Sequence, residues 1–376
     1  KMKTLIIFYP YNNLAVDQLS VIELLKKKYK IILLTIEERG SLHKAANDLN
    51  VISLSIFNKN NYFYNIIKKK IFLISKILYY IYLFYKFPKI IVKHRVKYVF
   101  AHLEVSGLVS SFYEKFFNFK SFYFRHSADA NLIEGNYRSK IINKLVNLMS
   151  NNIICVSSAV KKHLIKIERV NPKKITQIDY GYNFNLYYKY KSYKKKYKFS
   201  NSKTINLITI GRLVNLKRHI LIFKLMNKLK NSNKNYNLIC LGSGSKEKEL
   251  KNFIKINRLK NIRMFGFKKN ILDYLMQSDI LIHFSKSESF GHVVLEAALL
   301  KKTVLVCKNV GIFNSLINDK FNGFLVSKNN PINESLKILN TLTKKKAKQL
   351  GLKLHKSIIK KYHINNLERK YLELLK

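Results

Sequence analysis

The stretch that decides the fold reads SKSESFGHVVLEA and occupies residues 285–297. It follows an apolar run at residues 280–284 that has the length of a buried strand, and from Gly291 onward it continues as an apolar segment suited to a helix. A strand, a short loop and a helix in this order form the repeating unit of a parallel α/β sheet, whose loops bind ligands at the carboxyl ends of the strands. We therefore expect a ligand-binding loop at this point of the chain.

The loop and the helix after it each carry one carboxylate. Glu288 is expected in the loop and Glu296 in the first turns of the helix, which begins near Gly291 and His292. The amino end of a helix offers backbone N–H groups and a partial positive charge to a phosphate. Glu296 is then placed to bind a ribose diol, and Glu288 to accept hydrogen bonds from sugar hydroxyls. Two carboxylates do not suit a site for phosphate alone, so the stretch predicts a sugar nucleotide, which has hydroxyls at both ends and negative charge in the middle.

Two loops earlier in the chain carry glycines and cations that suit such a ligand. Residues Gly211–Lys217 follow a predicted strand, and Arg212 and Lys217 can clamp a diphosphate with a planar guanidinium and a point charge. Residues Gly242–Gly244 follow the next predicted strand and precede a predicted helix at Glu247–Ile256, and glycines allow a backbone to approach a ligand closely. Neither loop is specific alone, because chance Arg/Lys pairs are common among 71 Lys and Arg and a Gly-x-Gly also suits a plain turn.

Short apolar runs alternate with longer amphipathic segments along the chain, which predicts parallel sheets and, at 376 residues, two α/β domains. The predicted strands of the first half are residues 4–9, 31–36, 51–56, 98–101, 121–125, 152–156 and 175–178. Those of the second half are residues 205–210, 237–241, 262–265, 280–284, 303–307 and 323–326. A Lys/Tyr/Ser-rich stretch at residues 186–203 is expected to link the domains, and residues 355–376 have the pattern of a helix.

The composition allows real cores but carries a large positive charge. Hydrophobic residues make up 47% of the chain, with 24 Phe and 24 Tyr, which excludes a disordered basic tail. The 71 Lys and Arg against 21 Asp and Glu give a net charge of +50. Two explanations stay open: an anionic partner such as nucleic acid, a membrane or a phosphorylated substrate, and a codon bias, because residues with A/T-rich codons are abundant whereas Trp is absent.

The cysteines and the start of the chain indicate a cytoplasmic protein. The 3 cysteines form no C-x-x-C pair, which excludes a disulfide scaffold and a zinc ribbon. Cys155, Cys240 and Cys307 each fall inside a predicted strand, as reduced core residues do. The apolar run at residues 4–9 is too short for the core of a signal peptide and is interpreted as a strand.

The most apolar stretch, residues 71–87, is interrupted by Lys76 and Lys86 and is too short to span a membrane. Nine Lys and Arg and no acidic residue lie from Lys68 to Lys97. An apolar segment rich in Tyr and Phe between such flanks suits a helix that lies on an anionic membrane surface. An ordinary packed helix in a Lys-rich protein is the alternative.

The order of these motifs resembles that of glycosyltransferase family 4, whose members are retaining enzymes with the GT-B fold. The motifs that carry the resemblance are Gly211-Arg212 with Lys217, Gly242-Ser243-Gly244, Phe265-Gly266, Ser278-Asp279, Glu288 with Glu296, and Phe321–Val326. They cover the second half of the chain, and the first half matches weakly. The resemblance implies an α/β protein of two Rossmann-like domains that face a cleft. Residues 1–190 would form the acceptor side, residues 203–354 would bind the nucleotide-sugar, and a terminal helix at residues 355–376 would cross back to the first domain.

The resemblance also implies roles for single residues. Arg212 and Lys217 would hold the donor diphosphate and stabilise the leaving group, and Glu288 would contact the donor sugar. His126, after the predicted strand at 121–125, is the candidate for a histidine that the family carries near that sugar, and His102 is a poorer candidate. The residues implied in nucleotide binding are Gly211, Gly242, Gly244, Ser289, Phe290, Gly291 and Glu296, and no metal ligand is implied.

The implied activity is the transfer of a sugar, expected to be a hexose, from a UDP- or GDP-sugar to a hydroxyl of a glycan or lipid-linked acceptor, with retention at the anomeric carbon. Synthesis of bacterial surface polysaccharide or lipopolysaccharide is the expected setting, and neither a metal nor another cofactor is expected to be required. The expected location is the cytoplasm, with peripheral binding to the cytoplasmic face of the inner membrane through residues 68–97.

Two alternatives stay open. A basic nucleic-acid-binding protein would account for the charge, but the sequence has no helix-turn-helix pattern, zinc finger or RNP motif, and nucleic-acid binding does not account for Glu288 and Glu296. A GT-B binding subunit that has lost catalysis is the second alternative, because residues 9–13 contain no glycine where the family often has a Gly-rich loop.

Overall fold

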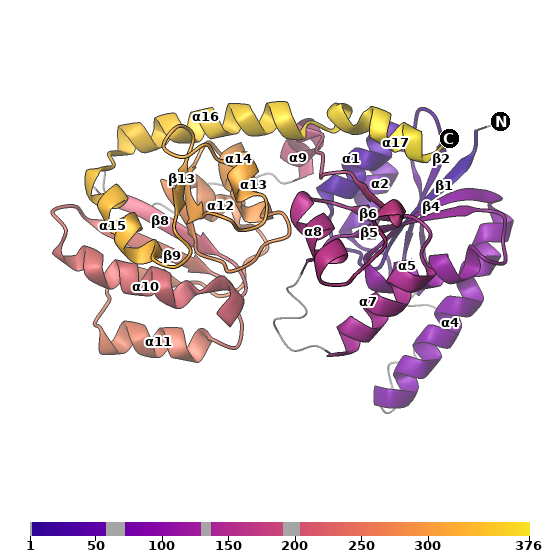
Figure 1. Ribbon diagram of the computed structural model, residues 1–376, viewed down its shortest axis with the longest axis horizontal. Coiled ribbons are helices and arrows are strands. Elements are labelled where there is room, and N and C mark those ends of the chain that lie inside the picture. The colour runs from indigo at the N-terminus through magenta and orange to yellow at the C-terminus, as the bar shows by residue number, and fades with distance from the viewer. Residues whose placement is uncertain (1, 58–71, 129–136, 191–203) are drawn as a thin grey trace. The chain divides into compact units, whose positions relative to one another are not determined.

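The structure, a computed structural model, describes residues 2–57, 72–128, 137–190 and 204–376 (Figure 1). The chain forms two compact units, which are described one at a time. Unit 1 contains residues 1–190 and 362–376, and unit 2 contains residues 191–361.

Unit 1 is built on a seven-stranded parallel sheet with the order β3-β2-β1-β4-β5-β6-β7 (Figure 1). Its strands are β1 Thr4–Tyr9, β2 Lys30–Thr35, β3 Ile52–Ser55, β4 Val96–His102, β5 Lys120–Arg125, β6 Ile153–Cys155 and β7 Ile175–Gln177. Its helices are α1 Val16–Leu25, α2 Ser41–Asp48, α4 Phe72–Lys93, α5 Leu103–Tyr113, α7 Tyr137–Met149, α8 Ser158–Lys166, α9 Phe184–Tyr190 and α17 Glu368–Leu374.

The sheet of unit 1 is covered on both faces, which explains why its central strands are apolar at successive positions. Leu5–Phe8 in β1 are fully buried. Because the side chains of a strand alternate between the two faces, neighbouring residues of β4 enter different cores. Val99 and Ala101 belong to the core cluster under α4, whereas Phe100 meets Tyr371 of α17, with ring centroids 6.0 Å apart. The last residues of the chain therefore complete one core of unit 1.

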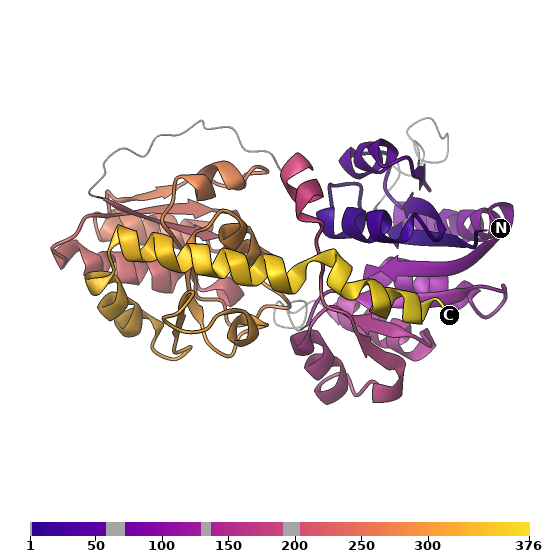
Figure 2. The same cartoon turned by 90° about the horizontal axis from the view of Figure 1, so that it is seen from above.

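Unit 2 is built on a six-stranded parallel sheet with the order β10-β9-β8-β11-β12-β13. Its strands are β8 Ile205–Ile210, β9 Tyr236–Leu241, β10 Ile262–Met264, β11 Ile280–His283, β12 Thr303–Cys307 and β13 Phe324–Val326. Its helices are α10 His219–Lys228, α11 Glu247–Ile256, α12 Leu272–Met276, α13 His292–Leu299, α14 Phe313–Leu316, α15 Pro331–Thr341 and α16 Lys344–Tyr362. Figure 1 shows the strands between α16 on one side and α10 and α11 on the other, and Figure 2 shows α16 running along this unit from above.

The order of strands reverses once in each sheet. In unit 1 the chain adds β2 and β3 on one side of β1 and then β4 on its other side, and in unit 2 it adds β9 and β10 on one side of β8 and then β11 on the other. At such a reversal the loops after the two central strands leave the sheet in opposite directions and open a crevice at the carboxyl edge. The fold thus places the loop after β8 and the loop after β11 at the position where α/β sheets bind ligands.

All predicted strands are present with ends shifted by a residue or two, and the predicted helix at Glu247–Ile256 is confirmed as α11. The three cysteines are free and buried, as predicted. The predicted linker at residues 186–203 is wrong in its first part, because residues 186–190 belong to α9. Its remainder, residues 191–203, lies outside the described residues.

The predicted helix at residues 355–376 is wrong in its continuity. Helix α16 begins earlier, at Lys344, and ends at Tyr362, and α17 begins only at Glu368. His363 between them is extended and forms a parallel β-bridge with Tyr182 of unit 1. The amide of Tyr182 donates to the carbonyl of Tyr362 at 2.8 Å, and its carbonyl accepts from the amide of Ile364 at 3.0 Å. A pairing between residues so distant in sequence has no signature in the local periodicity of the segment.

A buried glycine of α16 tests how closely this helix packs on unit 2. A Cβ added at Gly351 would lie 2.1 Å from the carbonyl oxygen of Lys301. We expect Gly351→Ala to lower the free energy of unfolding by about 1–3 kcal/mol, as overpacking does, although alanine is the better helix former by about 1 kcal/mol. Urea denaturation measures the difference. Gln349→Ala, at an exposed position of the same helix, is the control and should be neutral or stabilising. Equal stability of Gly351→Ala and wild type would contradict the close packing.

Candidate active site

Three loops at the carboxyl edge of unit 2 are joined by backbone hydrogen bonds. They are Gly211–Arg218 after β8, Gly242–Gly244 after β9 and Ser285–Gly291 after β11. The amide of Leu213, in the loop after β8, donates to the carbonyl of Ser243, in the loop after β9, at 2.9 Å. The amide of Lys286, in the loop after β11, donates to the carbonyl of Leu216, in the loop after β8, at 2.8 Å. The motifs that were singled out from the sequence therefore form one continuous edge.

The glycines of these loops are required by the approach of backbone to backbone. Gly242 has φ of +141°, and a Cβ at this position would lie 1.9 Å from the carbonyl oxygen of Gly211. A Cβ at Gly244 would lie 2.6 Å from the carbonyl oxygen of Leu213. Such distances are far below any real contact, so the two loops can lie against each other only because side chains are absent. This packing role comes in addition to the predicted contact of Gly211, Gly242 and Gly244 with a nucleotide.

The charged centre of the edge is the carboxylate of Glu288. Its Oε1 forms an ion pair with the ammonium of Lys217 and lies 2.6 Å from Nε2 of His283, which donates to it. Burial by itself would raise the pKa of Glu288, but the hydrogen bond from His283 and the positive charge of Lys217 outweigh it and lower the pKa to about 2. Glu288 is therefore an anion at any physiological pH, and it fixes the direction of the Lys217 side chain.

Helix α13 begins next to this centre. Gly291 precedes its first residue, His292, with φ of +99°, and a Cβ at Gly291 would lie 2.4 Å from the ring of Phe313. Phe290 is buried beside it. Glu296 lies one turn into the helix and is buried, with 7% of its surface exposed. The predicted helix start and the predicted place of Glu296 are confirmed, and the backbone of Ser289, Phe290 and Gly291 leads directly into the helix.

Arg212 differs from its predicted partner Lys217 in its surroundings. It lies in the loop after β8, but it is exposed, whereas the side chain of Lys217 is largely buried. Arg212 is therefore accessible to solvent, whereas Lys217 stays beside Glu288.

Arg218, which the sequence analysis did not single out, ties the loop after β8 to the other strands of the sheet. Its backbone is left-handed, with φ of +50°. Its guanidinium donates from Nε to the carbonyl of Phe284 at 2.6 Å, from Nη1 to the carbonyl of Lys328 at 2.9 Å and from Nη2 to the sulfur of Cys307 at 3.3 Å. The ends of β11, β12 and β13 are therefore linked to the residue that follows Lys217. Among 71 cations, no spacing distinguishes this arginine.

His219 was also missed. Its imidazole is buried, with 3% exposed, and within the described part of the chain neither ring nitrogen has a hydrogen-bond partner. Burial, and to a lesser extent His283 and Lys217, lower its pKa to about 3, so the ring is neutral. The ring lies 3.8 Å from a Cβ built on Gly211, which places it beneath the first loop.

In unit 1, His126 lies at the carboxyl edge of the sheet in a chain of polar side chains. Its Nε2 lies 2.8 Å from Nδ1 of His102, and its Nδ1 is hydrogen-bonded to the hydroxyl of Tyr180. The amide nitrogen of Gln18 lies 3.3 Å from the same Nδ1 of His102. With this amide as donor, Nδ1 of His102 is the acceptor, Nε2 of His126 donates to it, and the hydroxyl of Tyr180 donates to Nδ1 of His126.

This chain of hydrogen bonds assigns different positions to the two histidines. His102 is buried, and burial together with His126 lowers its pKa well below the usual value. Burial raises the pKa of Tyr180, as do the negative charge of Asp17 and the hydroxyl of Tyr9. His102 therefore holds the ring of His126 from inside the unit, and His126 is the outer member of the pair.

The architecture defines the fold. Two parallel α/β units, of seven and six strands, match the GT-B glycosyltransferases in structure. HepE of Anabaena, solved in complex with UDP-glucose, superimposes with a TM-score of 0.74 and 17% identity over 99% of both chains. At that identity the likeness concerns the fold.

Residues 191–361, which are the residues of unit 2, match the family model of the glycosyl transferases group 1. The match covers the whole of unit 2, which is less than half of the chain. An uncharacterized glycosyltransferase of Methanocaldococcus jannaschii is 27% identical over 227 residues, which cover 58% of this chain and 57% of that protein. A capsular polysaccharide biosynthesis glycosyltransferase, CapH of Staphylococcus aureus, is 29% identical over 229 residues, which cover 57% of this chain and 60% of that protein. The chain therefore spans less than two thirds of the length of these curated relatives.

The low pKa of Glu288 predicts how stability depends on pH. Because its pKa is lower in the folded than in the unfolded protein, its contribution is fully present above the ordinary pKa near 4.5 and is lost as the pH falls toward about 2. We expect Glu288→Gln to cost on the order of 2 kcal/mol at neutral pH and progressively less below pH 4.5, as measured by urea denaturation at a series of pH values.

Glu249→Gln is the matched control for this experiment. Its carboxylate is exposed and pairs with Lys246 at 2.7 Å, so its replacement should cost less than about 1 kcal/mol. A difference between wild type and Glu288→Gln that stays constant from neutral to acidic pH would show that Glu288 is not held as an anion.

Proposed function

We propose that the protein transfers a sugar from a nucleotide-diphosphate sugar to the hydroxyl of an acceptor, with the donor bound at the carboxyl edge of unit 2. The observation that carries this proposal is the Lys217–Glu288–His283 cluster at the strand-order reversal, beside the start of α13. A cation, a helix start and two carboxylates in one place match a ligand with a diphosphate between two polyhydroxyl groups. The group 1 match of residues 191–361 supports the same conclusion.

In the proposed reaction, the bond between the anomeric carbon and the diphosphate oxygen breaks, and the electron pair leaves with the nucleoside diphosphate. The acceptor oxygen bonds to the anomeric carbon, and its proton passes to the departing diphosphate. Lys217 and Arg212 stabilise the negative charge that develops on the diphosphate. An ammonium has three N–H donors, so Lys217 can bind Glu288 and phosphate oxygens together. Glu296 binds the ribose hydroxyls, and Glu288 contacts the donor sugar. A role of His126 near that sugar stays a prediction from the resemblance.

The finer points rest on resemblance. The order of motifs that resembles glycosyltransferase family 4 supports retention at the anomeric carbon and a reaction without a divalent metal. UDP-glucose in HepE and the capsular polysaccharide role of CapH support a UDP-sugar donor and a bacterial surface glycan as acceptor.

Replacement of Lys217 tests the site. Removing one preorganised charge that stabilises a transition state costs about 10²–10³ in rate, so we expect Lys217→Ala and Arg212→Ala to lose that much turnover of UDP-glucose or UDP-N-acetylglucosamine, with unchanged circular dichroism. Release of UDP is the measurement. Lys224→Ala, an exposed lysine of α10, is the control. Turnover at the wild-type level in both site variants would refute the assignment.

We also propose that unit 1 binds an anionic membrane surface, where a lipid-linked acceptor would be presented. No described helix is long and apolar enough to cross a bilayer. Helix α4, however, exposes Ile77, Ile81 and Tyr85 at helical spacing, each with more than half of its surface accessible. Helix α7 exposes Ile141 and Leu148 in the same way. Lysines border both apolar stripes, which is the pattern of helices that lie on anionic membranes.

The basic stretch that motivated this proposal, residues 68–97, is described from residue 72 onward. Lys68, Lys69 and Lys70 lie outside the described residues, and α4 supplies the rest up to Lys93. The surface proposed here is therefore defined by α4 and α7 alone.

Vesicle sedimentation tests the membrane surface. Burial of an isoleucine side chain contributes about 1.5–3 kcal/mol, so the double variant Ile77→Ser/Ile81→Ser should bind vesicles of phosphatidylcholine and phosphatidylglycerol at least about tenfold more weakly than wild type. Ile256→Ser, at an exposed isoleucine of unit 2, should bind like wild type. Equal binding of wild type to vesicles with and without phosphatidylglycerol would exclude an anionic surface as the partner.

A further inference from the structure

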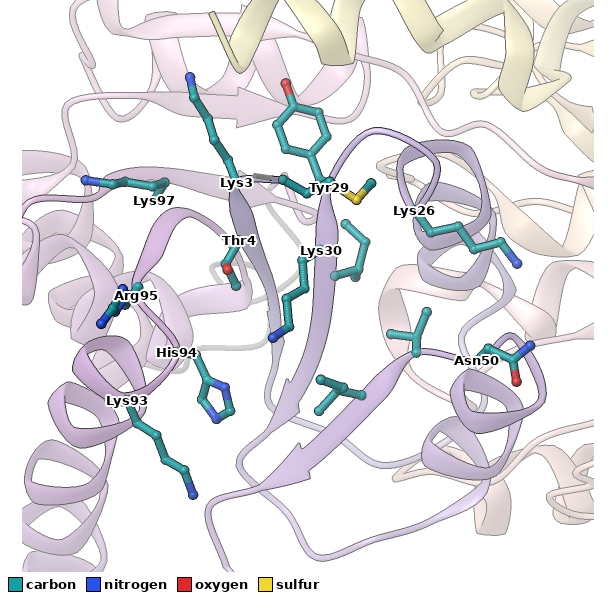
Figure 3. A pocket seen from close by; sticks show the side chains of 14 residues that line it. Lys3, Thr4, Lys26, Tyr29, Lys30, Asn50, Lys93, His94, Arg95 and Lys97 are labelled. Carbon is teal, nitrogen blue, oxygen red and sulfur yellow. The ribbon is translucent and has the colours of Figure 1, made fainter.

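A second concave site lies at the amino edge of the sheet of unit 1, opposite the edge that carries His126. It is a cavity of about 790 Å³ between the starts of β1, β2, β3 and β4 and the end of α4 (Figure 3). Its volume is within the range of small-molecule sites, about 300–1,000 Å³. Neither the donor site of unit 2 nor the polar chain around His126 contributes a residue to it.

The lining of this cavity is strongly basic. Its charged residues are Lys3, Lys26, Lys30, Lys93, Arg95 and Lys97, accompanied by His94. No Asp or Glu is among the 14 residues that line it. Like charges repel one another when they gather around one space, and the unfavourable energy is relieved when an anion enters.

The local structure accounts for only part of this charge. Lys93 and Arg95 lie at the carboxyl end of α4, where a positive charge stabilises the helix by interacting with its last carbonyls. Lys30 and Lys97 lie at the starts of strands, where no helix end requires a cation. Both line the cavity from separate strands, but in Figure 3 only Lys30 is directed toward His94 at the end of α4, whereas the side chain of Lys97 is directed away from it.

Two of the lysines are held in place by partners. The ammonium of Lys3 donates to the hydroxyl of Tyr98 at 3.1 Å. Lys26 pairs with Glu23 at 2.8 Å and donates to the carbonyl of Leu49 at 3.3 Å. Among the described residues, Lys30, Lys93, Arg95 and Lys97 form no ion pair, so four cations of this cavity are not neutralised by the described part of the protein.

His94 reports where these charges converge. Its pKa is lowered, first by burial and then by the positive charges of Lys93 and Lys30. In Figure 3 the side chains of Lys30, His94 and Lys93 are directed into the same part of the cavity. The charges of Lys30, at a strand start, and of Lys93, at a helix end, therefore both act on the His94 ring. The resonance of this ring can be followed by NMR.

The opposite wall is apolar. Ile31 and Val51 are buried, and Met2 and Ile52 are half exposed at the rim. Tyr29 adds an aromatic ring, which packs edge-on against Tyr98 at 6.0 Å between centroids. A ligand with a charged head and a less polar body fits a cavity with one basic and one apolar side.

We propose that this cavity is a second anion site, which binds a phosphate-bearing ligand through Lys30, Lys93 and Arg95, separately from the donor site. The ligand is either a soluble phosphorylated compound or the headgroup of a phospholipid, since both present the same chemistry to these cations. The site is a binding site of unit 1 and does not depend on the activity proposed for unit 2.

The first test is a titration of the full-length protein with inorganic pyrophosphate, followed by NMR of histidine-labelled protein. The His94 ring resonance is assigned by its loss in His94→Gln. We expect pyrophosphate to shift this resonance and to raise the pKa of His94, because a bound anion offsets the charges of Lys93 and Lys30. Lys30→Gln/Lys93→Gln should weaken the binding by about tenfold or more, since two charged hydrogen-bond donors to the phosphate are lost.

The matched control removes the same number of charges from unit 1 outside the cavity. Lys27 and Lys162 are exposed and do not line it, so Lys27→Gln/Lys162→Gln should retain the wild-type affinity. An unchanged His94 resonance with pyrophosphate would overturn the proposal. Equal weakening of pyrophosphate binding in the two double variants would also overturn it, because the weakening would then follow from the loss of net charge alone.

A second arm identifies the source of the phosphate. Vesicles of phosphatidylcholine with phosphatidic acid are compared with pyrophosphate for the same two double variants. A loss of vesicle binding confined to Lys30→Gln/Lys93→Gln supports a lipid headgroup, and a loss of pyrophosphate binding alone supports a soluble ligand. If neither probe distinguishes the two double variants, the cavity is not an anion site.

Discussion

Both sheets of this protein are covered by helices on both faces, and this constraint determines where polar chemistry can occur. A charge in the middle of such a sheet would lose its hydration without gaining a partner. Leu5–Phe8 show the result, since they are fully buried and apolar without interruption. Cations and carboxylates are consequently placed at the two edges of the sheets. The carboxyl edge of unit 2 holds Lys217 and Glu288, and the amino edge of unit 1 holds a group of cations without acidic partners.

The charged centre of unit 2 is maintained by its neighbours in the protein. Glu288 stays ionised because His283 and Lys217 compensate its burial. The loop that carries Lys217 is in turn fixed by the guanidinium of Arg218, which reaches the ends of three strands. Glycine at position 242 allows the adjoining loop to lie in contact with it. Preorganisation of this kind lets a site act on a developing charge without first rearranging.

The strands, the helix starts and the motif loops could be predicted from the sequence because each depends on nearby residues. Alternating apolar runs predicted every strand, and the start of α13 followed from Gly291 and the apolar residues after it. The break at His363 could not be predicted, because it depends on pairing with Tyr182, nearly half the chain away. Arg218, His219 and His283 were missed for a similar reason. Arg218 binds groups far along the chain, and His283 meets Glu288 only because the loop after β11 folds back toward it. In a chain with 71 Lys and Arg, one more cation carries no signal.

The discontinuous composition of unit 1 has a consequence for the synthesis of the protein. Tyr371 packs against Phe100, and the hydroxyl of Tyr98 donates to the carbonyl of Leu375. A ribosome releases these last residues only after all of unit 2 has emerged, and domains generally fold in the order of synthesis. Unit 1 therefore has an open core face until α17 has been synthesised. Of the two units, the one that contains the earlier strands is completed last, and the aromatic face around Phe100 stays uncovered for that interval.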